Sequence, residues 1–330
     1  MVTIYRGKAG DPNYYLRPMS LDPRSHAVTQ RNVYYVFNSK SKLLGSGAMG
    51  SVYLCNAFKR DNDVAAVKVV TPKYQNNAKI RKRAKQEATM SFHHPHLIEM
   101  LGYCEFYDDH GPFLILSRYF PGINIDKYLS QNLRTGEDKV EVICGMMRQV
   151  LSALGYIHSL GIIHRDIKPS NIMVNNSRNV KLMDLGIARL EGGNEYSTIG
   201  FTGTPEYSAP EQMRYVKENL DNIGPYTDIY CLGITFYDLL TGYNPFKAST
   251  DVETLKRQWE MKLPDDSSIP KPLMKVLWKA TEKNPKNRYQ SADDFDKAIE
   301  EAMNGNDNPF EGVLKKIKDR LNKIIGWFYK

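Results

Sequence analysis

Two short segments of the chain carry side chains that could transfer a phosphoryl group. Asp166, Lys168 and Asn171 lie in the run HRDIKPSN, and Asp184 lies further along in KLMDLG. Asp166 is a carboxylate that can accept or orient a hydroxyl proton, and Lys168 can neutralise charge that develops on the transferred group. Asn171 and Asp184 offer the hard oxygen ligands that magnesium prefers when it bridges phosphate oxygens. These residue types predict phosphoryl transfer with Mg²⁺ or Mn²⁺.

A glycine-rich segment precedes these groups. It reads LGSGAMGSVY and carries Leu44, Gly45, Gly47 and Gly50. This glycine pattern is weak evidence for a nucleotide site by itself, because it also occurs in dinucleotide-binding folds. There it opens a helix and is followed by an acidic residue, and Asp61 or Asp63 could be that residue. Gly50 is followed by Ser-Val-Tyr-Leu, which favours a strand. The segment therefore favours a hairpin whose backbone comes close to phosphates.

One lysine lies in an otherwise apolar segment. Lys68 belongs to VAAVKVV, where its neighbours predict a buried strand and leave one ammonium in need of an anionic partner. Glu87 lies on a predicted helix at 79–90 and is the expected partner, because an ion pair would direct the amine toward nucleotide phosphates.

The elements that must position these groups change along the chain. Short β-branched and aromatic runs predict strands at 34–37, 51–58, 64–70 and 113–120. Helical patterns dominate afterwards, at 140–159, 227–240, 252–261, 273–281 and 292–303. We therefore expect an α+β chain with a β-rich first part and an α-rich second part.

Taken together, the motifs resemble the protein kinase superfamily. The resemblance spans about residues 40–303 and adds the segment Ala209-Pro210-Glu211, Asp228 with Gly233, and Arg288 to the motifs above. GAMGSVYL, HRDIKPSN and NPKNRYQSADDF are most similar to bacterial Ser/Thr kinases of the eukaryotic-like (Hanks) type. The resemblance implies a bilobal protein kinase fold, with a small β-rich N-lobe holding one main helix and a larger helical C-lobe.

The resemblance also implies an activity and a nucleotide site. ATP would supply its γ-phosphoryl group to protein Ser or Thr hydroxyls, because Lys168 at this position resembles Ser/Thr kinases, whereas tyrosine kinases typically carry an Arg two or four residues after the aspartate. Val52, Ala66 and Met173 would sandwich the adenine, and backbone groups of Arg118 and Phe120 would bond its edge. Ser117 would be the gatekeeper. The sequence Asp-Leu-Gly stands where Asp-Phe-Gly is common in the family. This difference changes a packing residue and keeps the expected metal-binding carboxylate of Asp184.

Regulation is implied by the residue before Asp166. Arg165 would pair with a phosphate on the activation segment, residues 187–208. The candidate phosphosites are Ser197, Thr198 and Thr202, and we expect autophosphorylation at one or more of them. Thr204 is expected to be structural, with its hydroxyl bonded within the catalytic loop.

Three further residues are expected to support the scaffold. Glu211 and Arg288 would form a buried ion pair that ties the substrate shelf to the helical lobe. Asp228 would bond the backbone of the catalytic loop. Histidines 93, 94, 96, 110 and 158 form no ligand-like cluster with carboxylates or thiolates along the sequence.

The chain is expected to divide into four parts. These are an N-terminal extension at 1–32, an N-lobe at 33–119, a C-lobe at 120–303, and a linker with a C-terminal helix at 304–330. The first part shows no sustained periodicity and favours a loosely packed arm. The last part ends in VLKKIKDRLNKIIGWFYK, which predicts a basic amphipathic helix. That helix could dock on the C-lobe, bind a partner or lie on an anionic membrane.

Composition limits the cellular compartment and the chemical class of partner that we expect. The 45 Lys and Arg exceed the 37 Asp and Glu by 8, which favours an anionic partner without requiring nucleic acid. The four cysteines are widely spaced and suit a reducing compartment. No signal peptide or membrane span is expected, so we expect a cytoplasmic protein, with residues 313–330 as a candidate contact with the inner membrane surface.

Two other function classes stay open at this point. A pseudokinase scaffold would bind nucleotide or partners without turnover, and the complete set of catalytic residues argues against it. A small-molecule phosphotransferase of the same fold is disfavoured by the Ala-Pro-Glu segment and by GTPEY, which by resemblance build a peptide-binding surface.

Overall fold

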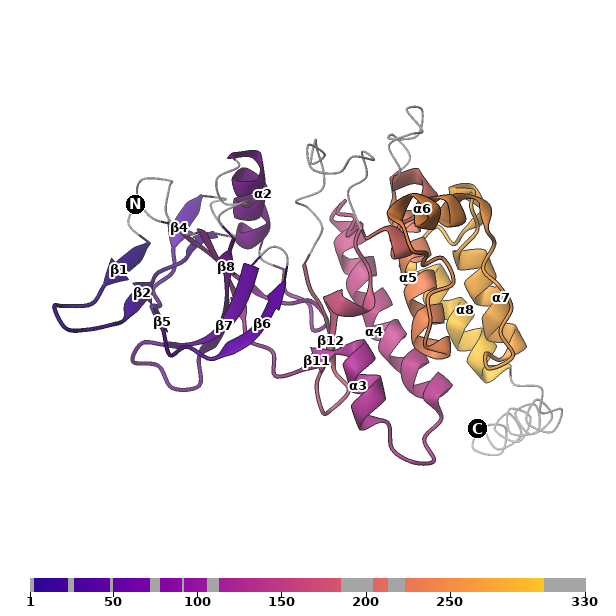
Figure 1. Ribbon diagram of the computed structural model, residues 1–330, viewed down its shortest axis with the longest axis horizontal. Helices are drawn as coiled ribbons and strands as arrows, with labels where there is room; N and C mark the ends of the chain where they lie inside the picture. The colour runs from indigo at the N-terminus through magenta and orange to yellow at the C-terminus, as the bar shows by residue number, and fades with distance from the viewer. Residues whose placement is uncertain are drawn as a thin grey trace, which may run out of the picture.

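The computed structural model describes residues 3–22, 27–47, 50–71, 78–90, 92–105, 113–184, 204–212 and 223–305. They form a β-rich lobe and a helical lobe that lie side by side (Figure 1). The activation segment up to residue 203 and the basic segment 313–330 lie outside the described residues, so the expectations for them stay predictions.

A ten-stranded antiparallel sheet forms the first lobe, in the order β1-β2-β5-β7-β8-β10-β9-β3-β4, with β6 paired to β7. Its strands are β1 (Ile4–Arg6), β2 (Tyr14–Leu16), β3 (Met19–Leu21), β4 (Val28–Gln30), β5 (Tyr35–Phe37), β6 (Leu43–Gly47), β7 (Gly50–Ala57), β8 (Val64–Val70), β9 (Met100–Glu105) and β10 (Phe113–Arg118). One helix, α2 (Ala78–Thr89), packs against β9 and β10.

Alternation along the central strands separates a core face from a site face. On β8, Ala65 and Val67 are fully buried in the core of the sheet, together with Leu116 of β10. Ala66 and Lys68 alternate with them and remain partly exposed. Since successive side chains of a strand point to opposite faces, VAAVKVV places Lys68 on the face away from this core.

The expectation of a loosely packed arm at the N-terminus is wrong. The four strands β1 to β4 lie at the two ends of the sheet order, and Leu16 on β2 is fully buried. Each strand is three residues long, which is too short for a hydrophobic period to show in the sequence. Strands on both sides of residue 32 therefore belong to one sheet.

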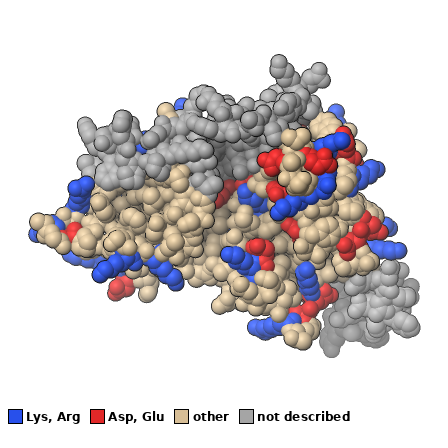
Figure 2. All heavy atoms as spheres, viewed as in Figure 1, with Lys and Arg blue, Asp and Glu red and all other residues tan. Residues whose placement is uncertain are grey.

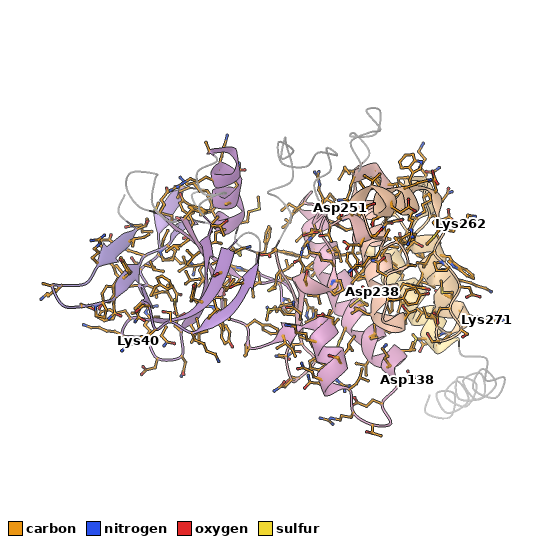
Figure 3. The ribbon with its side chains drawn as sticks, in the orientation of Figure 1. Lys40, Asp138, Asp238, Asp251, Lys262 and Lys271 are labelled. Carbon is orange, nitrogen blue, oxygen red and sulfur yellow. The ribbon has the colours of Figure 1, made fainter. Side chains whose placement is uncertain are left out.

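The second lobe is built from α3 (Ile125–Asn132), α4 (Lys139–Ser159), α5 (Pro225–Thr241), α6 (Asp251–Glu260), α7 (Lys271–Ala280) and α8 (Ala292–Asn304). Asp138, labelled in Figure 3, caps α4 by accepting hydrogen bonds from the N–H groups of Val140 and Glu141. By length and composition α4 is apolar enough to cross a membrane, and in the structure its apolar side chains pack in the core against α5 and α8.

A small three-stranded sheet, β11 (Ile123–Asn124), β12 (Ile172–Val174) and β13 (Val180–Leu182), lies where the lobes meet. The Ile98 N–H donates to the Leu182 carbonyl at 3.1 Å, and the Leu182 N–H donates to the His96 carbonyl at 2.8 Å. These backbone bonds attach the chain between α2 and β9 to β13.

On the face shown in Figure 2, basic and acidic side chains lie interspersed over the helical lobe.

Candidate active site

The run HRDIKPSN is held in place by a buried carboxylate on α5. Asp228 is fully buried and accepts hydrogen bonds from the N–H groups of His164, at 2.8 Å, and Arg165, at 2.7 Å. The ring of His158, at the end of α4, lies 2.8 Å from the same carboxylate. Arg165 has a φ of 65°, an unfavourable conformation for a residue with a side chain, and these bonds hold it there. The sequence spacing contained no signal for His158.

Three side chains of this candidate site, those of Lys168, Asn171 and Thr204, meet around Asp166. Lys168 Nζ lies 3.1 Å from Asp166 Oδ2 and donates to Thr204 Oγ1 at 2.6 Å. The Thr204 hydroxyl donates to Asp166 Oδ1 at 3.3 Å, and Asn171 Nδ2 donates to Asp166 Oδ2 at 2.9 Å. The Asp166 carboxylate is only 10% exposed, so its orientation is set by these donors.

His164 links the catalytic loop to the segment that carries Asp184. The Asp166 N–H donates to His164 Nδ1 at 3.3 Å, which leaves Nε2 to carry the ring proton and donate to the Met183 carbonyl at 3.0 Å. The Met183 N–H in turn donates to the Asn171 carbonyl at 2.9 Å. Asp184 follows Met183 and has a φ of 50°, an unfavourable conformation for a residue with a side chain. The hydrogen bonds of the Met183 backbone help to hold Asp184 in it.

Lys68 and Asp184 meet across the two lobes. Lys68 Nζ lies 3.7 Å from Asp184 Oδ2, and the Asp184 side chain is 57% exposed. The side chain of Glu87, the predicted partner of Lys68, lies outside the described residues. Lys68 therefore reaches the carboxylate that is predicted to bind metal, and its pairing with Glu87 stays a prediction.

The three glycines of the glycine-rich hairpin differ in what surrounds them. A Cβ at Gly50, where φ is 154°, would lie 2.2 Å from the Val69 carbonyl oxygen. Among the described residues, a Cβ on Gly45 or Gly47 would meet nothing within 4 Å. Packing within this part of the chain therefore demands glycine at Gly50, whereas close approach of a ligand is the expected reason for glycine at the other two positions. Leu44, beside them on β6, is 37% exposed.

The residues predicted to contact adenine lie on one face of the sheet and on β12. Val52 pairs with Lys68 across β7 and β8, and Ala66 pairs with Ser117 across β8 and β10. Met173 is the partly exposed residue of β12, between buried neighbours. The sheet register therefore brings Val52, Ala66 and Ser117 to the face that carries Lys68.

Arg118, at the end of β10, has partners that the sequence did not reveal. Its N–H donates to the Glu99 carbonyl at 2.8 Å, its Nε donates to Glu99 Oε2 at 3.2 Å, and its Nη1 bonds Asp63. The carbonyl of Phe120 accepts the Gly122 N–H at 2.9 Å. Asp63, one of two residues that could have been the acidic residue of a dinucleotide-binding fold, instead bonds Arg118 at the end of β10.

Among the regulatory candidates, Thr204 and Arg165 are described, and the phosphosites Ser197, Thr198 and Thr202 lie outside the described residues. Burial lowers the pKa of the Arg165 guanidinium, and its buried Nε finds no acceptor within the described part of the chain. A guanidinium in this state is suited to an anionic partner.

Two polar contacts tie the segment after Thr204 to the helical lobe. Glu211 and Arg288, both almost fully buried, form a two-pronged pair at 2.7 and 2.9 Å, and Thr227 Oγ1 also donates to Glu211 at 2.9 Å. The Tyr207 hydroxyl donates to Asp238 on α5 at 2.6 Å, and Figure 3 shows Asp238 within the helical lobe. Burial and this carboxylate raise the pKa of Tyr207.

The donor set at the site fits a hard divalent cation. Because the amide nitrogen of Asn171 donates to Asp166, its amide oxygen is the atom left to bind a cation. Asp184 adds a largely exposed carboxylate. Two oxygen ligands of this kind suit Mg²⁺, which binds through one or two protein oxygens and substrate phosphates and keeps several of its waters.

Comparisons with known proteins agree with this geometry. The sequence profile described as "Protein kinase domain" matches residues 38–303. The chain is 30% identical over 269 residues to serine/threonine-protein kinase PrkC of Bacillus subtilis, covering 79% of this chain and 40% of that protein. It is 32% identical over 275 residues to serine/threonine-protein kinase PknB of Mycobacterium tuberculosis, covering 80% and 42%. The chain thus spans less than half of the length of these relatives.

Solved structures agree as well. A mutant form of the kinase domain of PknI from Mycobacterium tuberculosis superposes with a TM-score of 0.59 at 25% identity and covers 79% of this chain and 94% of that one. The predicted bilobal α+β fold is confirmed, and so is the resemblance to bacterial Ser/Thr kinases. With a matching profile over most of its length, relatives named as Ser/Thr kinases and this shared fold, the chain belongs to the protein kinase family.

Proposed function

We propose that this chain transfers the γ-phosphoryl group of ATP to Ser or Thr hydroxyls of proteins. The observation that carries the proposal is the arrangement around Asp166, where Lys168, Thr204 and Asn171 all contact one weakly exposed carboxylate. A hydroxyl substrate at this carboxylate would be oriented by it, and Lys168 would neutralise charge on the group in transfer.

Each residue has a defined part in this mechanism. ATP with Mg²⁺ supplies the activated phosphoryl group, and Lys68, Asn171 and Asp184 are the residues that would hold the nucleotide phosphates and the cation. Asp166 accepts the hydroxyl proton as the new oxygen–phosphorus bond forms and the bond to the ADP leaving group breaks. The hydrogen bond from Lys168 to Thr204 keeps the ammonium beside Asp166. A Ser or Thr acceptor is supported by the relatives, which are named as Ser/Thr kinases.

The Asp166→Asn variant tests this directly. Removing the base should lower the rate of labelling from radiolabelled ATP by about 10²- to 10⁴-fold, the usual contribution of general base catalysis. The exposed Asp265→Asn variant is the matched control and should keep the wild-type rate. Equal labelling by the wild type and Asp166→Asn would overturn the proposal. Nucleotide binding without any transfer would favour the pseudokinase alternative.

Autophosphorylation of Ser197, Thr198 or Thr202 is part of the proposal. It is supported by Arg165, whose buried guanidinium nitrogen lacks an acceptor within the described residues. Mass spectrometry of active protein should find phosphate on at least one of the three residues, and none in the Asp166→Asn variant. An active enzyme without phosphate on them would contradict this part and leave the transfer reaction standing.

A further inference from the structure

We propose that residues 3–22 and 27–32, called here the N-terminal segment, hold helix α2 in the position that catalysis requires. The inference rests on the proposed function, because α2 carries Glu87, the predicted partner of Lys68. The N-terminal segment makes polar and apolar contacts with β9, the strand that packs against α2, and these contacts are the basis of the inference. Among the strands of this segment, β3 contacts α2. Figure 1 shows α2 over the same lobe.

The polar contact begins at Thr3, directly before β1. Its hydroxyl donates to the Glu105 carbonyl at 2.6 Å and accepts the Glu105 N–H at 2.9 Å. Thr3 is 1% exposed, so water does not compete for these bonds. Glu105 is the last residue of β9, and Thr3 therefore satisfies both backbone groups at the end of that strand.

The side chain of Glu105 carries the contact on to α2. Arg81 on α2 donates to Glu105 Oε2 through Nη2 at 2.9 Å and through Nε at 3.1 Å, and Lys85 Nζ lies 2.7 Å from Oε1. Arg81 is 7% exposed, and its guanidinium lies over the Phe113 ring. One residue, Glu105, thus joins the N-terminal segment through its backbone and α2 through its carboxylate.

The apolar contact comes from β3. Met19 packs against the small cluster of Val70, Tyr103, Phe113 and Ala88, in which Ala88 belongs to α2. Gly102 on β9 is built for this close approach, since a Cβ there would lie 1.9 Å from the Met19 carbonyl oxygen. The N-terminal segment therefore forms part of the surface on which α2 rests.

Loss of these contacts should loosen α2 and weaken catalysis. A helix of this length has little stability of its own and depends on the face that it buries. The position of α2 decides whether Glu87 can meet Lys68, whose Nζ lies 3.7 Å from Asp184. The segment acts through α2 and touches no reacting atom, so its residues are positioning residues.

The test uses the full chain and three variants. Thr3→Val keeps the shape of the side chain and removes both hydrogen bonds, whereas Thr3→Ser restores the hydroxyl. Thr29→Val makes the same chemical change at an exposed position of β4 in the same segment. Two quantities are measured: hydrogen exchange of the α2 amides, residues 78–89, and kcat/KM for ATP.

The expected result is that Thr3→Val speeds exchange in α2 and lowers kcat/KM by about three- to tenfold, as for loss of net-stabilising hydrogen bonds. Thr3→Ser and Thr29→Val should behave like the wild type. Unchanged exchange in α2 would overturn the inference, and so would faster exchange with an unchanged kcat/KM. A wild type without any transfer would refute the proposed function instead, and the exchange data would still show whether the segment holds α2.

Discussion

At the scale of single residues, the three glycines of the hairpin are expected to be glycine for different reasons. The fold requires Gly50, whereas a bound ligand would require Gly45 and Gly47. A side chain at Gly50 would collide with the backbone at Val69, whereas a Cβ at Gly45 or Gly47 would meet no atom of the described residues within 4 Å. The sequence shows the same residue type at all three positions. Only the surroundings of each Cα distinguish a glycine that the fold requires from one that a ligand would require.

We predict opposite behaviour for two alanine substitutions. Gly50→Ala should lower the free energy of unfolding by about 1–3 kcal/mol, because of the clash with the Val69 carbonyl oxygen and its φ of 154°. Gly47→Ala should change that free energy by less than about 0.5 kcal/mol and should weaken ATP binding. Urea unfolding and the Kd for a fluorescent ATP analogue measure the two effects. The functional assignment of Gly47 is wrong if Gly47→Ala binds ATP as the wild type does.

At the scale of elements, the run HRDIKPSN and residues 204–212 are attached to helices of the second lobe by buried polar groups. Asp228 on α5 holds the backbone of His164 and Arg165, and Arg288 bonds Glu211 and three backbone carbonyls, at Tyr226, Glu282 and Lys283. Removing the partner of such a group lowers the free energy of unfolding, because a buried charge without its partner keeps its full desolvation penalty.

Arg288→Met should therefore be strongly destabilising. The variant leaves Glu211 buried and without its counter-ion, and we expect a loss of about 3–5 kcal/mol in the free energy of unfolding. Arg257→Met is the matched control, because Arg257 pairs with Glu253 at 3.5 Å on the exposed side of α6, where such a pair contributes at most about 1 kcal/mol. Urea titration measures both. Similar losses in the two variants would contradict the role given to the buried pair.

At the scale of the whole molecule, the stability of the chain should depend on the charge of one buried lysine. Lys283 Nζ donates to the Tyr230 hydroxyl at 2.7 Å and to the Gln258 carbonyl at 2.6 Å, and lies over the Phe246 ring. Burial, followed by repulsion from Arg288, lowers the pKa of Lys283 from 10.5 to about 7.

The sign of the pH effect follows from proton binding. Between pH 7 and the unfolded-state pKa, the unfolded chain holds a proton on Lys283 that the folded chain has lost, so this group makes the free energy of unfolding rise with pH. From pH 7 to pH 8.5 the rise is at most about 2 kcal/mol. Lys283→Met should remove it, and the exposed Lys275→Met should not. Urea unfolding across this range measures the rise, and equal pH slopes in the wild type and Lys283→Met would contradict the prediction.

The sequence by itself determined the family, the two-part fold and the set of chemical groups. The reason is that HRDIKPSN, the glycine-rich hairpin and the strand around Lys68 are short runs in which local spacing carries the information. Tertiary structure alone decided that Thr3 meets Glu105, that His158 joins Asp228, and that Arg118 lies between Asp63 and Glu99. It also turned the expected loose arm into four strands of the sheet. These contacts join residues far apart in the chain, and their bonds depend on burial and register, which no local pattern records.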